Sequence, residues 1–261
     1  MSALDIAATG MLAQQLNVEV IANNIANLNT TAYKRQRPEF QDLLYQDLKL
    51  VGSSSSDNGT IDASGIQLGT GVKTGTVYRI TSQGNMVSTE NTLDLAIEGK
   101  GYFQIELPSG AIAYTRAGSL QLSPSREIVN ADGFRVLPGI TIASDVMQVT
   151  VNASGEVLVQ VSGQTSPQNV GQLELATFPN EAGLQAVGGN LFLESASSGS
   201  PTTGTPGSTG FGTVLQGFLE SSNVNMVTEI TTLIAAQRAY EMNSKVIQTA
   251  DEMMQAANQV T

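Results

Sequence analysis

The amino-acid sequence predicts an α+β protein, in which N- and C-terminal helices form a coiled-coil core domain and the chain between them forms an all-β domain of short antiparallel strands. Apolar residues recur every seven positions at both ends of the chain, which is the spacing of a coiled coil. Between the ends, short runs of alternating apolar and polar residues are separated by glycine-containing turns, which is typical of antiparallel sheets.

Residues 1–33 are predicted to form the first helix. Ser2 is a plausible N-cap, with Asp5 in the first turn. Gly10 lies inside the helix, where glycine costs about 1 kcal/mol relative to alanine, so it either permits a close helix contact or is tolerated on the surface. The predicted apolar seam of this helix consists of Leu4, Met11, Val18, Ile21, Ile25 and Leu28.

Residues 223–261 are predicted to form the second helix. The segment contains no glycine or proline and is rich in Ala, Gln, Glu and Met, which favour helix. Either Asn223 or Asn225 is suited to cap its start. The predicted apolar seam of this helix consists of Met226, Ile230, Leu233, Tyr240, Ile247 and Met254.

The chain is predicted to divide into four parts. Residues 1–35 carry the first helix and pair with residues 215–261, which carry the second, to make one core domain. Residues 36–75 form an extended arm that contains a serine-rich insert, and residues 76–214 form the all-β domain.

Turn residues divide the all-β domain into hairpins. Residues 108–110 and 153–155 each end in glycine between two strand-like runs, which predicts a three-residue hairpin loop with glycine in the left-handed position. Residues 52–59 and 195–212 are of low complexity, rich in Ser and Gly, and are predicted to be flexible or extended rather than packed.

The composition excludes several classes of function. The 261 residues include no His and no Cys, so a Ser-His-Asp or Cys-His catalytic set, a Cys/His zinc site and a disulfide are all impossible. We therefore predict no catalytic residues, no cofactor and no metal. The formal net charge is −11, whereas nucleic acids and anionic membrane surfaces bind basic patches. No apolar run is long enough to span a bilayer, so direct membrane insertion is not expected.

Both helices carry apolar side chains beyond a single two-helix seam. Leu12, Leu16 and Val20 lie outside the first seam, and Ile234 and Val246 lie outside the second. Apolar stripes must be buried, and identical neighbours supply further helices most readily. The pattern leaves two possibilities open, namely one antiparallel coiled coil in a monomer, or self-assembly into a helical filament.

Separated motifs along the whole chain resemble the bacterial flagellar basal-body rod and hook family. They are ANNIANLNTTAYKR at 22–35, TLDLAIEGKGYF at 92–103 with YTRAG at 114–118, and QGFLESSNVN at 216–225 with QRAYE at 237–241. The signature residues of the first motif are Asn23, Asn24, Asn27, Asn29 and Tyr33. The sequences of the motifs are most similar to those of the distal-rod members of the family.

The resemblance implies a structural subunit and not an enzyme. Members of the family are exported by the flagellar type III export apparatus and stack as a homo-oligomeric hollow helical tube. For a distal-rod member it implies a rigid drive shaft that transmits torque from motor to hook, in the basal body between periplasm and outer membrane. The implied partners are proximal rod proteins, the hook protein and the surrounding ring bushing of the envelope. The insert that distinguishes rod from hook would fall within residues 45–69.

Two positions depart from the family pattern. The family usually has Gly where Ala32 stands, and alanine would be strained there at positive φ, so we expect this turn to be built differently. The family also tends to have an Asx-Gly turn before the strand at Ile128, where this chain has SPSR at 123–126. The signature asparagines are expected either to fix the register of packed helices or to make local caps and turns.

Two other functions compete with a shaft protein. A carboxylate-based cell-wall hydrolase needs only paired Asp or Glu residues, but the acidic residues of this chain are scattered. A secreted adhesin or coat protein would also suit a surface poor in charge, and a mutant that lacks such a protein should still swim.

Overall fold

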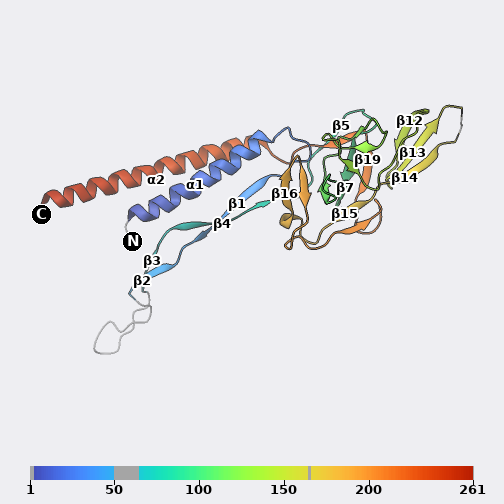
Figure 1. Cartoon of the computed structure of the whole chain (residues 1–261). Coiled ribbons are helices and arrows are strands. Elements are labelled where there is room, and N and C mark those ends of the chain that lie inside the picture. The colour runs from blue at the N-terminus through green and yellow to red at the C-terminus, as the bar shows by residue number, and fades with distance from the viewer. Residues whose placement is uncertain (1–2, 50–64, 164–165, 261) are drawn as a thin grey trace. The chain divides into compact units, whose positions relative to one another are not determined.

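The computed structural model describes residues 3–49, 65–163 and 166–260. Helix α1 (Ala3–Ala26) and helix α2 (Met226–Val260) lie at the two ends of the sequence, and short antiparallel strands lie between them (Figure 1). This arrangement confirms the predicted α+β class, whereas coiled-coil packing stays a prediction. The proposed cap Ser2 and the serine-rich insert at 52–59 lie outside the described residues.

The chain forms two compact units. The helical unit contains Met1–Ala26, Gln36–Tyr78 and Asn225–Thr261, and the β unit contains Asn27–Arg35 and Arg79–Val224. These units divide the chain differently from the predicted domains, because the segments that follow α1 and precede α2 belong to the β unit.

The first helix ends at Ala26, so the prediction of a helix through residue 33 is wrong at its end. Asn27 stops it, because its carbonyl and side-chain oxygens accept hydrogen bonds from the backbone N–H (3.2 Å) and the hydroxyl (3.1 Å) of Thr30. Ala32 then adopts φ 57°, so the expectation of a differently built turn is also wrong. The left-handed conformation costs a non-glycine residue about 1–2 kcal/mol. Burial of Ala32 and the 2.8 Å hydrogen bond from its N–H to the Glu220 carbonyl hold it there.

The second helix begins at Met226, and Asn225 caps it. The Asn225 side-chain oxygen accepts a hydrogen bond from the backbone N–H of Thr228 at 3.1 Å, which satisfies one of the free donors of the first turn. Of the two candidate caps, Asn225 is therefore the one used.

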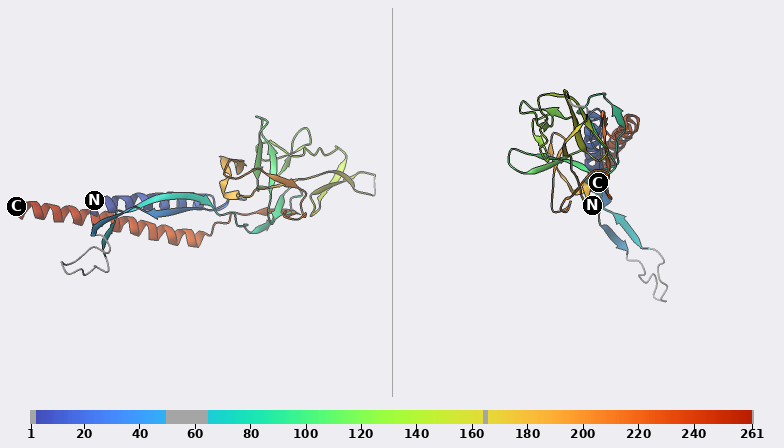
Figure 2. Two further views of the ribbon diagram at one scale, coloured as in Figure 1. Left: turned by 90° about the horizontal axis from the view of Figure 1, so that it is seen from below. Right: turned by 90° about the vertical axis from the view of Figure 1, so that its right-hand side faces the viewer.

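Two narrow ribbons complete the helical unit. Strand β1 (Gln36–Asp42) pairs with β4 (Val72–Arg79), and β2 (Tyr45–Lys49) pairs with β3 (Ile66–Gly69). The ribbon is attached to α1 at both ends, since Asn24 bonds the backbone of Gln36 and the hydroxyl of Thr9 accepts from the Val72 N–H at 3.3 Å. The predicted arm therefore consists of two β ribbons, of which the β1–β4 ribbon lies beside α1 (Figure 2).

The β unit is built from short strands around one main sheet. The order in that sheet is β16-β17-β8-β7-β11-β10-β9, with β15 joining β7 to β18. Strands β12, β13 and β14 form a second sheet, and β19 with β6 and β20 with β5 form two further pairs. The strands of the whole β unit are β5 (Met86–Ser88), β6 (Leu95–Glu98), β7 (Tyr102–Glu106), β8 (Ile112–Thr115), β9 (Gln121–Leu122), β10 (Ile128–Val129), β11 (Arg135–Val136), β12 (Val146–Val151), β13 (Glu156–Val161), β14 (Gln168–Gln172), β15 (Leu175–Thr177), β16 (Gln185–Gly188), β17 (Leu191–Leu193), β18 (Thr202–Gly204), β19 (Thr213–Gln216) and β20 (Phe218–Glu220).

The hairpin turns follow the sequence pattern. Strands β7 and β8 flank residues 108–110, and strands β12 and β13 flank residues 153–155, both pairs antiparallel. Gly110 (φ 80°) and Gly155 (φ 77°) take the left-handed positions, which confirms both predicted hairpins. The SPSR turn at 123–126 places Arg126 at φ 62°, a left-handed conformation that glycine adopts more readily.

The low-complexity segment at 195–212 is mostly exposed but is anchored to the β unit at several positions, so the prediction that it is not packed is wrong at those positions. Ser198 is fully buried, and the Ser195 hydroxyl donates to the Gly183 carbonyl at 2.6 Å. Strand β18 of this segment pairs with β15. Serine hydroxyls supply hydrogen bonds to backbone groups that a packed segment without regular structure would otherwise leave unpaired.

Candidate assembly interface

Helices α1 and α2 lie side by side and run antiparallel (Figures 1 and 2). Two contacts fix the register, since Asn24 bonds Glu229 and a Cβ added at Gly10 would lie 2.9 Å from the Asn243 side-chain nitrogen. On α2 these contacts belong to a row with seven-residue spacing in which Ala236 and Ala250 are buried. Because the row carries no large apolar side chain, the two backbones can approach closely.

The predicted seams flank this contact row. Ile21 is buried, and most other seam residues are partly or fully exposed. Leu4, Met11, Val18, Ile25, Leu28, Leu233 and Ile247 are half-buried, whereas Met226, Ile230, Tyr240 and Met254 are exposed. Leu28 follows the end of α1 and lies in the β unit. The seven-residue spacing therefore appears in the structure, but the row in contact on α2 is the one with small residues.

Large apolar side chains remain on the outside of the helix pair. Leu12 of α1 is 65% exposed, and Met242 of α2 is 70% exposed. Ile234 and Val246, which the sequence places outside the seam, are also exposed, whereas Val20 is buried. Apolar residues at this density on one helix pair mark a surface for further packing.

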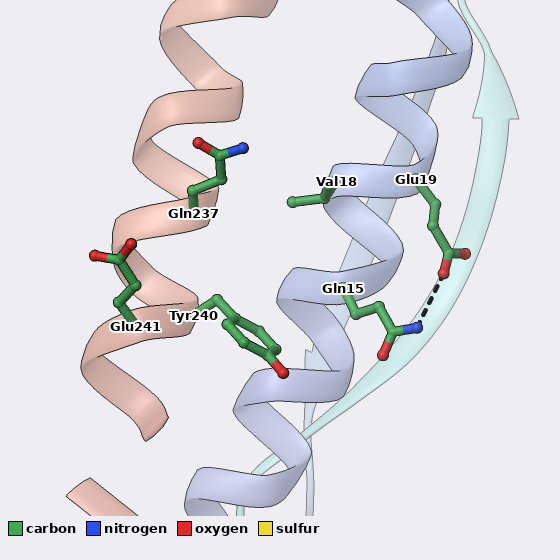
Figure 3. A pocket seen from close by; sticks show the side chains of 6 residues that line it. All are labelled: Gln15, Val18, Glu19, Gln237, Tyr240 and Glu241. Atoms are coloured by element: carbon green, nitrogen blue, oxygen red, sulfur yellow. Dashed lines mark hydrogen bonds between the residues drawn. The ribbon is translucent and has the colours of Figure 1, made fainter. Parts of the chain in front are cut away.

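A groove of about 550 Å³ opens between the helices (Figure 3). Gln15, Val18 and Glu19 of α1 form one wall of the groove. The opposite wall belongs to α2, from which the Tyr240 ring points toward α1. Its amide and carboxylate rim around an apolar floor is suited to receive an amphipathic side chain or helix.

The signature asparagines have different roles in the structure. Asn24 is buried and donates to the Glu229 carboxylate (3.2 Å) and to the Gln36 carbonyl (2.9 Å), so it joins both helices to β1. Asn27 makes the local turn described above. Asn23 and Asn29 are exposed, and Tyr33 is half-buried. The Asn24 side chain thus bonds across the helix pair.

A buried ionic cluster lies in the β unit. Glu220 accepts a hydrogen bond from Lys34 at 2.5 Å and from Arg116 Nε at 2.8 Å, and all three side chains are at most 5% exposed. The remaining Arg116 nitrogens donate to backbone carbonyls, namely those of Ile97, Gly99 and Gly101. The guanidinium also stands 5.8 Å from the Tyr102 ring centre. Every charge of the cluster therefore has a partner, as burial requires.

The neighbouring charges set the ionisation of the cluster. Burial raises the pKa of Glu220, but the charges of Arg116 and Lys34 and the hydrogen bonds that Glu220 accepts outweigh burial, so its pKa lies below the usual value. Burial lowers the pKa of Lys34, which Glu220 opposes. The carboxylate is thus held ionised, and it fixes both cations.

Family models match three regions of the chain. Residues 4–34 match a model described as flagella basal body rod protein, residues 96–159 the D1 domain of flagellar hook protein FlgE/F/G, and residues 215–260 the C-terminal region of flagellar basal body rod FlgEFG proteins. A protein of Caulobacter vibrioides named flagellar basal-body rod protein FlgG is 58% identical over 100% of this chain and 99% of its own length. The chain belongs to the flagellar basal-body rod protein family.

Other flagellar proteins are similar over nearly the same length. FlgG of Agrobacterium fabrum is 50% identical over 97% of each chain. The flagellar hook-basal body complex protein FlhP of Bacillus subtilis is 28% identical, also over 97% of each chain. The rod family is a structural one and not a family of enzymes. Neither described helix is long and apolar enough to cross a membrane.

The ionic cluster is the feature of this rod-family chain that sequence reasoning missed. Lys34, Arg116 and Glu220 each lie in a different one of the regions that the three family models match. The signal that points to them is a charged residue inside each of three otherwise mostly neutral motifs of a chain that has few charges.

Proposed function

We propose that this chain is a structural subunit of the flagellar distal rod, which self-assembles into a hollow, rigid helical shaft and transmits torque from motor to hook. The observation that carries the proposal is the exposed apolar face of the α1–α2 pair, in a chain that resembles FlgG proteins from end to end. Burial of one large apolar side chain contributes about 1.5–3 kcal/mol, so a few such residues per contact suffice to drive association.

The proposed contacts are between copies of the chain. The predicted seam residues that a single copy leaves exposed, such as Met226, Ile230 and Met254, would pack against helices of neighbouring subunits. Such contacts join two different faces, and a series of them that does not close builds a helical tube. The monomeric coiled coil is disfavoured, because one copy leaves this face uncovered.

The family supplies the remaining parts of the proposal. The partners would be proximal rod proteins, the hook protein, the ring bushing of the envelope and the type III export apparatus, with no nucleic acid and no direct membrane insertion. The shaft would span from the periplasm to the outer membrane within the basal body. The adhesin and wall-hydrolase alternatives have no comparable support in the family.

Complementation of a deletion strain tests the proposal. Wild-type chain should restore swimming, and the double variant Ile230→Ser/Ile234→Ser should not, because it removes apolar area from the proposed contact. Val187→Ser is the matched control, since Val187 and Ile234 are each 47% exposed but Val187 lies in β16 of the β unit. Helical reconstruction of purified rods then locates the helices. If the deletion strain swims, the proposal is overturned in favour of an adhesin. If the double variant forms normal rods, Ile230 and Ile234 do not belong to the contact between subunits.

A further inference from the structure

Three stretches of the β unit that are remote in sequence meet at Glu220. They are residues 27–35, 79–85 and 217–224. Backbone hydrogen bonds join them in pairs: the Ala32 N–H donates to the Glu220 carbonyl, the Ile80 N–H to the Arg35 carbonyl and the Ser221 N–H to the Asn85 carbonyl, each at 2.8 Å. The three stretches are therefore bound to one another and not only to the sheet.

The Glu220 carboxylate makes the same connection through its side chain. One oxygen accepts from Lys34 Nζ at 2.5 Å and from the Gly84 N–H at 2.9 Å, and the other accepts from Arg116 Nε at 2.8 Å. Lys34 and Gly84 belong to the other two stretches, and Arg116 is bonded to carbonyls of β6 and of the loop between β6 and β7. One buried carboxylate thus ties all three stretches to the main body of the β unit.

Asn223 repeats this pattern. Its side chain donates to the carbonyls of Ile80 (2.8 Å) and Ser82 (2.9 Å) and accepts from the Arg35 N–H (2.7 Å). A second polar side chain of the 217–224 stretch therefore binds the same two partner stretches. We name the set of Lys34, Gly84, Arg116, Glu220 and Asn223 the clamp.

The clamp stretches also contain every point at which the chain passes between its two units. The chain crosses after Ala26, before Gln36, after Tyr78 and before Asn225. Each crossing lies at an end of one of the three stretches that the clamp binds. The clamp therefore connects all the segments through which the chain enters and leaves the β unit.

We propose that Glu220 is a positioning residue that holds all four chain crossings together on the β unit, so that a force acting between the units enters the β unit at one buried point. The mechanical reading rests on the proposed rod function, whereas the clamp itself is a property of the single chain. Loss of the Glu220 carboxylate should loosen the three stretches while the main sheet stays intact.

Amide hydrogen exchange of the purified full-length chain tests the clamp. In Glu220→Gln, the amides of Ala32, Ile80, Ser221 and Asn223 should exchange about tenfold faster or more, while amides of β7 and β8 change by less than about twofold. None of the four amides bonds the side-chain carboxylate, so their exchange reports the stretches themselves. Glu106→Gln is the control, because it breaks a glutamate–arginine pair with Arg135 (2.7 Å) whose side chains are about 40% exposed.

Each outcome decides the proposal. If exchange in β7 and β8 accelerates as much as at the four amides, Glu220 has only a general role in stability. If exchange at the four amides is unchanged, Glu220 does not hold the three stretches together. If Glu220→Gln does not fold, Lys34→Met leaves the Arg116 and Gly84 bonds in place and should accelerate Ala32 and Asn223 selectively. Uniform acceleration in that variant would also overturn the proposal. Exchange of the monomer does not depend on rod assembly, so failure here leaves the complementation result unaffected.

Discussion

The helical unit and the β unit differ in where most of their large apolar side chains lie. In the β unit, Phe103 and Ile105 are fully buried, and exposed apolar residues are scattered. In α2 the buried residues include Glu229, Ala236 and Ala250, while much larger side chains lie in solvent. The β unit has a core of the ordinary kind, whereas the helical unit leaves many of its large apolar side chains exposed in the single chain.

The largest expected effect is a cavity in the β unit. Phe103→Ala removes a fully buried ring and should lower the free energy of unfolding by about 3–5 kcal/mol, measured by urea unfolding. Met254→Ala on the exposed face of α2 is the control and should change it by less than about 0.5 kcal/mol. Similar losses in both variants would break the contrast between the units.

A smaller effect is expected from overpacking of the helix contact. Ala236 is 3% exposed, so Ala236→Leu forces a large side chain into a buried position and should cost about 1–3 kcal/mol in the monomer. Ala235→Leu, one residue earlier on the exposed side, is the matched control and should be nearly neutral. The circular dichroism signal of the helices follows the transition. A neutral Ala236→Leu would show that the contact row is not close-packed.

The smallest effect is expected from pH. The pKa of Glu220 is lower in the folded chain than its usual value of 4.5, so its contribution to stability is complete above pH 4.5 and is lost as pH falls through the folded-state pKa. Urea unfolding of the chain between pH 7 and pH 3, followed by tyrosine fluorescence, should therefore show a steeper acid loss for wild type than for Glu220→Gln. Parallel pH profiles would assign the acid sensitivity to other carboxylates.

Local features of the fold are predictable from the sequence, and features that depend on remote contacts are not. The loops that end in Gly110 and Gly155 follow from turn chemistry alone. The end of α1 does not, because Ala32 is held in the left-handed region by a bond to the remote Glu220 carbonyl. In the sequence, the seven-residue pattern of α2 is most visible in its large apolar side chains. In the structure, the row of α2 that contacts α1 is a different one, in which Asn243 lies against Gly10.

The candidate site is predictable to the same extent. The exposed apolar face is predictable, because the sequence of the two helices contains more apolar residues than a single two-helix seam can bury. The ionic cluster brings together residues from three distant motifs, and no spacing rule connects Lys34 with a glutamate 186 positions away. Only the folded chain shows that a single carboxylate serves both cations.

The discontinuous units impose an order on folding. Hairpins such as β7–β8 join neighbouring residues and can close as soon as they are made, since short loops close fast. Asn24 must wait for Glu229, which lies 205 positions later, and Lys34 must wait for Glu220. During synthesis, α1 therefore has no α2 to pack against until almost the whole chain exists. A nascent chain therefore keeps its N-terminal segment unpaired until these remote partners exist, and the β unit, which needs residues only as far as Val224, can be completed before α2 joins α1.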